Sequence, residues 1–204
     1  MKVVRKMPPY FSIEFSFNSK EIYPNFVNDI YSVFFNNNFT FKHSYDKDNS
    51  SIDQIIKWNQ RKLEKEVMHE FTPLTEESDY KQIILENDLF QEVRLFWMFL
   101  RREIRLILIT PENEVLDNNE RFIPSKIEPF LHISKKVWEL TNVSAIQTSL
   151  ECDGGTAMLY KLQNRQEQLW VRVFVIVNES MIDVTHNYDM YKIERNGVVL
   201  VNKF

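Results

Sequence analysis

Glycine is scarce in this chain, with three residues at positions 154, 155 and 197. A glycine-rich phosphate loop needs several glycines at short, fixed spacing, because the bare backbone must approach the phosphate groups. Neither G-x-G-x-x-G nor the P-loop pattern can be written with these three positions. The sequence therefore excludes the common nucleotide-binding folds in their usual form, and we expect no cofactor.

Cysteine is nearly absent as well. Cys152 is the single cysteine, so no disulfide can form within the chain, which is typical of proteins from reducing compartments. The longest uninterrupted apolar run covers residues 95–100, whereas a membrane-spanning helix needs about 20 apolar residues. We therefore expect a cytoplasmic protein that makes no use of a membrane.

An excess of positive charge is also missing, since 25 Lys and Arg residues face 29 Asp and Glu residues and the net charge is −4. Proteins that bind nucleic acid usually carry a basic patch that neutralises phosphates. The charge balance therefore disfavours nucleic acid as a partner. Hydrophobic residues make up 44% of the chain, which is ordinary for a folded globular protein and argues against disorder.

Hydrophobic periodicity predicts both strands and helices in the first third of the chain. Alternation of apolar and polar residues predicts strands over 10–17 and 39–43. Helical spacing predicts a helix over 24–34, which begins at Pro24, and a second helix over 51–67, which Ser50 caps. The chain therefore opens as β-α-β.

The remainder is predicted to be rich in strands. A hairpin that turns at Arg101 and Arg102 explains 93–109 better than a helix that would be apolar on every side. Pro129 marks the predicted start of a helix that extends to Trp138. Strands are then predicted from Val143 onward, over 148–151, 156–162, 169–177, 190–194 and 198–201, with turns at Asp153-Gly154-Gly155 and Asn196-Gly197.

These patterns predict the α+β class, with a mixed or largely antiparallel β-sheet of about seven to ten strands and three to four helices packed on it. We expect residues 1–204 to form a single α+β domain, and a division into sub-lobes 1–75 and 76–204 is the alternative. The patterns leave 76–92 unassigned between helix and strand.

Cys152 is a poor candidate for a nucleophile. A reactive thiolate needs a positive neighbour, but Cys152 is flanked by Glu151 and Asp153. The four histidines also lack the spacing of a zinc site, so we expect no bound metal. They are His43, His69, His132 and His186.

His186 lies in the polar stretch that gives the best candidate for an active site. Asp183 and Asp189 flank it, and Asp153 and Glu151 could converge on it from a neighbouring loop. An imidazole among carboxylates suits acid–base or metal-dependent hydrolysis. The alternative interpretation is a turn between two strands, because Asp and Asn are ordinary turn residues.

Arg101, Arg102 and Arg105 form a basic group beside aromatic residues, and Arg94 lies nearby. Such a group could hold single-stranded nucleic acid by charge and base stacking. It could equally be a hairpin with a buried aromatic side and solvated arginines. Trp58 is a further candidate contact residue, because it sits at the edge of the apolar stripe of its predicted helix.

Our main functional expectation is a non-enzymatic protein-binding module of the inhibitor, immunity or accessory type in a microbial cytosol. An acidic protein with many aromatic residues suits a protein partner and favours a basic one, because complementary charge speeds encounter. The alternative from another class is a small enzyme with an Asp/His-centred site around His186. Single-stranded nucleic-acid binding at the arginine group is the third hypothesis.

Overall fold

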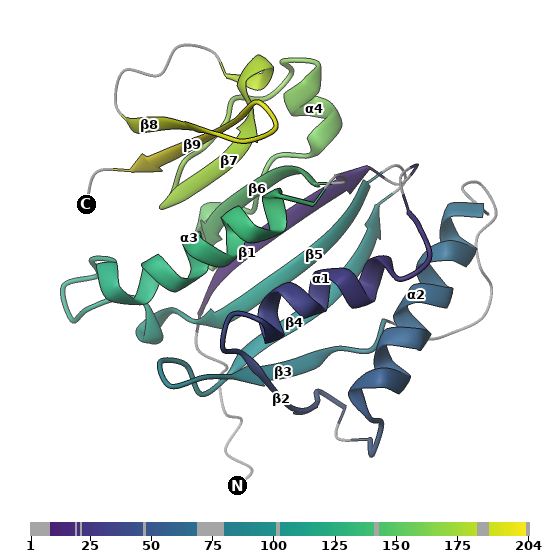
Figure 1. The fold of residues 1–204 in the computed structure, drawn as a ribbon. Coiled ribbons are helices and arrows are strands. Elements are labelled where there is room, and N and C mark those ends of the chain that lie inside the picture. The colour runs from purple at the N-terminus through teal and green to yellow at the C-terminus, as the bar shows by residue number, and fades with distance from the viewer. Residues whose placement is uncertain are drawn as a thin grey trace, which may run out of the picture.

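The computed structural model describes residues 9–18, 20, 22–46, 48–68, 80–100, 103–140, 143–182 and 188–202. In these residues nine strands form one antiparallel sheet with the order β2-β3-β4-β5-β1-β6-β7-β9-β8, accompanied by four α-helices (Figure 1). The strands are β1 (Tyr10–Asn18), β2 (Thr40–Ser44), β3 (Ile83–Glu86), β4 (Val93–Leu100), β5 (Glu103–Pro111), β6 (Val143–Leu150), β7 (Phe174–Asn178), β8 (Tyr188–Ile193) and β9 (Gly197–Asn202). The helices are α1 (Phe26–Phe35), α2 (Ile52–Met68), α3 (Pro124–Trp138), α4 (Leu159–Gln163) and three short 3₁₀ helices, η2 (Glu112–Glu114), η3 (Glu151–Asp153) and η4 (Glu179–Met181). The predicted α+β class is confirmed.

Strand β1 lies at the centre of the sheet, between β5 and β6. Its four phenylalanine and isoleucine side chains, at positions 11, 13, 15 and 17, are fully buried on the face that we call the helix face. Ser12, Glu14 and Ser16 alternate with them and point to the opposite face, which we call the second face. The alternation that predicts a strand here therefore also sorts apolar from polar side chains between two faces.

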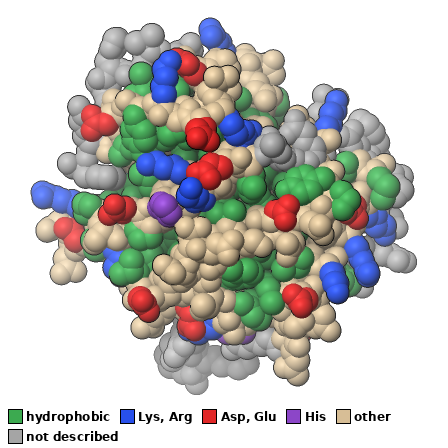
Figure 2. Space-filling model, viewed as in Figure 1, with side chains coloured by type: hydrophobic (Ala, Val, Ile, Leu, Met, Phe, Trp, Pro, Cys, Tyr) green, Lys and Arg blue, Asp and Glu red, His purple; other side chains and the backbone are tan. Residues whose placement is uncertain are grey.

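Helices α1, α2 and α3 all cover the helix face (Figure 1). Phe34 of α1 packs edge-on against Phe15 with the ring centroids 6.2 Å apart, and Phe130 of α3 lies 6.1 Å from Phe11. Aromatic pairs of this kind stabilise the fold by more than the burial of their surface alone. Lys, Arg, Asp and Glu side chains lie interspersed with hydrophobic ones over this side of the molecule (Figure 2).

Three predicted helix starts differ from the structure. Helix α1 begins at Phe26 rather than at Pro24, because Asn25 has a left-handed backbone with φ of 74°. Helix α2 is capped by Ser51 rather than Ser50, through a reciprocal pair in which Gln54 N donates to Ser51 Oγ and Ser51 N donates to Gln54 Oε1. Helix α3 begins at Pro124, so the predicted start at Pro129 is wrong. Pro129 lies inside the helix, where its ring removes one backbone hydrogen bond, and burial of the neighbouring Ile127 and Phe130 outweighs that loss.

The strand predicted over 156–162 is wrong, because this stretch contains α4. Leu159 and Leu162, three residues apart on one side of α4, pack on the second face against Val175 of β7 and Leu200 of β9. The strand predicted over 169–177 is shorter than expected, since β7 begins at Phe174. The predicted hairpin over 93–109 is confirmed as β4 and β5, and β3 lies within the stretch that the patterns left unassigned.

The predicted C-terminal hairpin is confirmed as β8 and β9, but its turn is one residue earlier than expected. The two residues with positive φ are Arg195 and Asn196, at 58° and 53°, and Gly197 N donates to Glu194 O. Gly197 is therefore the first residue of β9. Glycine is required there for space, because an added Cβ would lie 2.3 Å from Trp138 Nε1.

Candidate functional site

Within the described residues, the second face of the sheet is covered over one half. Residues 156–171, which we call the cover segment, pack with Ala145, Val175 and Leu200 over β6, β7 and β9. Helices α1 to α3 lie on the helix face (Figure 1), so none of the helices in the described part of the chain lies over β3, β4 and β5 on the second face. The structure thus contains a boundary, between β1 and β5, where the cover ends.

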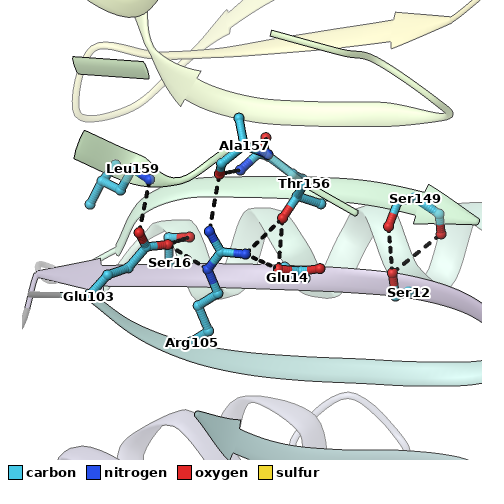
Figure 3. Close-up of polar contacts among 10 residues, drawn as sticks. Ser12, Glu14, Ser16, Glu103, Arg105, Ser149, Thr156, Ala157 and Leu159 are labelled. Atoms are coloured by element: carbon cyan, nitrogen blue, oxygen red, sulfur yellow. Dashed lines mark hydrogen bonds and ion pairs between the residues drawn. The ribbon is translucent and has the colours of Figure 1, made fainter. Parts of the chain in front are cut away.

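Arg105 lies at this boundary and bridges two carboxylates (Figure 3). Its Nε donates to Glu103 Oε1 at 2.6 Å and its Nη1 donates to Glu14 Oε2. Nη1 also donates to Thr156 Oγ1 at 3.0 Å, and Nη2 donates to the Ala157 carbonyl at 3.2 Å. Arg105 therefore uses each of its three guanidinium nitrogens on groups of the protein itself.

The two carboxylates hold the cover segment in turn. Glu103 accepts hydrogen bonds from Ser16 Oγ at 2.8 Å and from Leu159 N at 2.9 Å, and Glu14 accepts one from Thr156 Oγ1 at 2.7 Å. Burial alone would lower the pKa of Arg105, but Glu103 and Glu14 together raise it. We call Glu14, Glu103, Arg105 and Thr156 the Arg105 cluster. Its charged groups form hydrogen bonds with one another and with residues 157 and 159, so the cluster attaches the start of the cover segment to the sheet.

Of the arginine group predicted for nucleic acid, Arg105 lies within the described residues. Arg105 is buried, with 6% of its surface exposed, while Arg101 and Arg102 lie outside the described residues. Trp58 is on the outer side of α2 and is 42% exposed, with Lys81 Nζ 5.8 Å from its ring centroid. Of these candidates, the structure places Trp58 at the surface.

The residues predicted for an Asp/His site are described only in part. His186 and Asp183 lie outside the described residues. Asp189 is on β8, and Glu151 and Asp153 are in η3 after β6. Strands β8 and β6 are three strand spacings apart in the sheet order, which is about 14 Å. The structure therefore does not bring Asp189 together with Glu151 and Asp153.

Glu151 and Asp153 instead lie near Glu112 and Arg172. Asp153 Oδ2 accepts from Leu150 N at 2.8 Å and is 3.5 Å from Arg172 Nε. Burial, and to a lesser extent the charges of Glu151 and Asp153, raise the pKa of Glu112. Cys152 is exposed, and its Sγ is 3.9 Å from Asp153 Oδ1. The described residues contain no group of His, Cys, Asp and Glu that could hold a metal ion.

The uncovered half of the second face presents a group of side chains that the sequence analysis did not single out as a site. Cross-strand pairing places Arg94 opposite Ile109, Phe96 opposite Ile107 and Met98 opposite Arg105, all on the side of Ser12 and Glu14. We call the following partly exposed residues the Arg94 surface: Tyr45, Arg94, Phe96, Met98 and Ile109. Met98 is 37% exposed. The signal in the sequence was the alternation of Arg94, Phe96 and Met98 with the buried Leu95 and Trp97.

Arg94 is held in place at the centre of this surface. Its guanidinium carbon lies 3.6 Å from the centroid of the Tyr45 ring and 5.4 Å from that of Phe96. Its Nε donates to Gln82 Oε1 at 2.5 Å. Within the described part of the chain, no residue accepts a hydrogen bond from its two Nη groups and no carboxylate forms an ion pair with it. The Nη groups are therefore available as donors.

Two shallow hollows lie elsewhere on the described surface. One of about 410 Å³ is lined by Trp138, Gln163, Asn178 and Arg195 among others. The second, of about 490 Å³, lies where the end of α1 meets α3, and there His132 Nε2 is 3.1 Å from Asn37 Oδ1. Their linings mix amide and hydroxyl groups with apolar side chains, and neither lining includes a residue of the Arg94 surface.

Comparison with known proteins gives no match: no family model fits the chain, and neither a curated protein nor a solved structure resembles it significantly. Among the described helices, none combines the length and apolar character needed to cross a membrane.

Proposed function

We propose that this protein is a non-enzymatic protein-binding module of the inhibitor, immunity or accessory type, and that the Arg94 surface is its binding face. The observation that carries the proposal is the one-sided cover of the second face. The cover segment lies over β6, β7 and β9, while apolar side chains of β4 and β5 stay partly exposed. Exposed apolar groups of this kind often mark interaction sites.

The composition of the surface supports a protein partner. Aromatic residues, Met and Arg are enriched at the centres of protein–protein interfaces, whereas Lys and Glu are depleted there. Tyr45, Arg94, Phe96 and Met98 belong to the enriched types. The sheet beneath them is fixed by long strands with buried neighbours such as Leu95 and Trp97, so little conformational entropy would be lost when a partner binds.

The net charge of −4 supports a partner with positive net charge. Charge of opposite sign steers two proteins together over a Debye length of about 8 Å at physiological ionic strength. This long-range attraction raises the association rate of the two proteins. It does not determine which side chains meet at the binding face.

Site-specific photo-crosslinking tests the proposal. A benzoylphenylalanine placed at Met98 should give a discrete adduct with one protein in the cells that produce this chain. The matched control carries the same group at Lys57, which is exposed on α2 on the opposite side of the sheet. Adducts that are the same from both positions, or a folded Met98 variant that gives none, would refute the proposal.

A further inference from the structure

We propose that the Arg94 surface recognises a protein segment in which an Asp or Glu side chain stands between apolar residues. The carboxylate would bind the two Nη groups of Arg94. This inference rests on the proposed function and deepens it, because it assigns the chemistry of the partner's contact.

The first argument is the state of Arg94 itself. A guanidinium binds a carboxylate through two parallel N–H···O hydrogen bonds, provided that the edge of its plane is open. Tyr45 lies against the flat face of the Arg94 guanidinium, and Gln82 fixes Nε, but no described group accepts from the Nη edge. Stacking and the Gln82 bond reduce the rotamers that Arg94 must give up on binding. Arg94 is therefore preorganised for a carboxylate.

The second argument is the setting of Arg94 among apolar residues. In one row across the sheet, Ile109 of β5 lies beside Arg94 of β4, whereas Ile84 of β3 on the other side is buried. Neighbouring strands are about 4.8 Å apart, so the partly exposed Ile109 lies about one strand spacing from Arg94. Phe96, two residues along the same side of β4, is also partly exposed. A matching segment therefore carries apolar side chains next to its carboxylate, one toward Ile109 and one toward Phe96.

The same geometry disfavours a single-stranded nucleic acid. Binding of that kind relies on free aromatic faces on which bases stack and on several cations along the backbone. The Tyr45 ring is covered by Arg94 at 3.6 Å, so that face is not free for a base. Arg105, the next arginine on this side of the sheet, is saturated by Glu14 and Glu103. Among the arginines that the structure describes on this face, Arg94 alone keeps donors available, which matches a single carboxylate.

A random twelve-residue peptide library displayed on phage, selected against the full chain, tests the inference. The enriched peptides should share an Asp or Glu flanked by apolar residues. The best peptide is then synthesised with blocked ends, in its Glu or Asp form and in its Gln or Asn form. Neutralising the acid should weaken binding to the wild-type chain about tenfold or more, as loss of a charged hydrogen-bonded pair does.

The protein variants complete a double-mutant cycle. The Arg94→Gln variant should bind the acidic peptide about tenfold or more weakly than the wild type does. It should bind the acidic and neutral forms of the peptide with equal affinity. Arg94→Lys keeps the charge but loses the planar pair of donors, so it should bind the acidic peptide with intermediate affinity. Arg61→Gln, on the exposed side of α2, is the matched control and should bind like the wild type. Thermal unfolding followed by circular dichroism verifies that each variant is folded.

Three outcomes would overturn the inference: enriched peptides without a shared acidic position, equal binding by wild type and Arg94→Gln, or no enrichment at all. A gel shift of a labelled fifteen-nucleotide oligo(dT) by the wild-type chain, lost in the Arg94→Gln variant, would assign the surface to nucleic acid instead. The proposed function is judged separately. A crosslinked protein adduct at position 98 that persists in the Arg94→Gln variant would support the protein-binding function and refute only the proposed carboxylate contact.

Discussion

Gly197 opens β9 directly beneath the indole of Trp138, and an added Cβ would lie 2.3 Å from Nε1 and 2.7 Å from Cε2. The indole is itself held, because Nε1 donates to Glu194 O at 3.0 Å. The substitution Gly197→Ala should therefore overpack this contact and lower the free energy of unfolding by about 1–3 kcal/mol. Urea denaturation of the two chains measures the difference.

The cause of that loss is tested with two further variants. If the clash with Trp138 is responsible, Gly197→Ala should cost clearly less in a Trp138→Leu background, because the smaller side chain leaves room for the methyl group. Gly154→Ala is the matched comparison, since Gly154 has φ of 80° and no atom within 4 Å of an added Cβ. Its cost comes from the backbone and should not change with Trp138. Equal costs of Gly197→Ala in both backgrounds would contradict the steric explanation.

At the scale of elements, the Arg105 cluster joins the cover segment to strands β1 and β5. The substitution Arg105→Met leaves Glu14 and Glu103 buried without a cation and should destabilise the fold by about 3–5 kcal/mol. It also removes the hydrogen bond to the Ala157 carbonyl. Because the opening of a segment depends on its own contacts, trypsin should cleave after Lys161 and Arg165 faster in the variant under native conditions.

The control is a variant in which the whole cluster is neutral, with Glu14→Gln and Glu103→Gln added to Arg105→Met. Removing all charges together is far less costly than removing one partner, so most of the stability should return. Cleavage should slow again, since the amide oxygen introduced by Glu103→Gln can still accept a hydrogen bond from Leu159 N. If the triple variant were as unstable as Arg105→Met alone, the uncompensated carboxylates would not be the cause.

Elements with a single dominant period were predictable from the sequence, and those that depend on distant partners were not. Strand β1 and the β4–β5 hairpin follow from local alternation. Helix α4 was mistaken for a strand because residues 157–162 are apolar or aromatic except at Lys161, so this short stretch fits either period, and because the acceptor for Leu159 N is Glu103, 56 residues away. No local pattern records a partner at that distance.

The candidate site shows the same limit. The arginine group was recognised as unusual, but the burial of Arg105 depends on Glu14, 91 residues earlier, and on the cover segment. Arg94 was noted only as a neighbour of that group. Its significance comes from Tyr45, which stacks on it from beyond β2, and from the absence of a described helix over this half of the second face. The Asp/His hypothesis at His186 stays a prediction, because Asp183 and His186 lie outside the described residues.

At the scale of the whole molecule, the position of β1 determines which parts can fold together. Strand β1 pairs with β5 along its full length and with β6 on its other side. A fragment of residues 1–140 would lose β6 to β9 and the cover segment. It would leave one edge of β1 without hydrogen-bond partners, and Arg105 without Thr156 and the Ala157 carbonyl. Unpaired strand edges next to exposed apolar surface promote aggregation.

We therefore expect the fragment 1–140 to aggregate or to unfold without a cooperative transition, as measured by size-exclusion chromatography and thermal denaturation. Co-expression with residues 143–204 should restore a soluble complex that unfolds cooperatively, because β6 can then pair with β1 again. The full-length chain is the control. A monomeric fragment 1–140 with a sharp transition of its own would show that β1 needs no partner beyond β5 and that residues 1–140 fold as a unit without the strands from β6 onward.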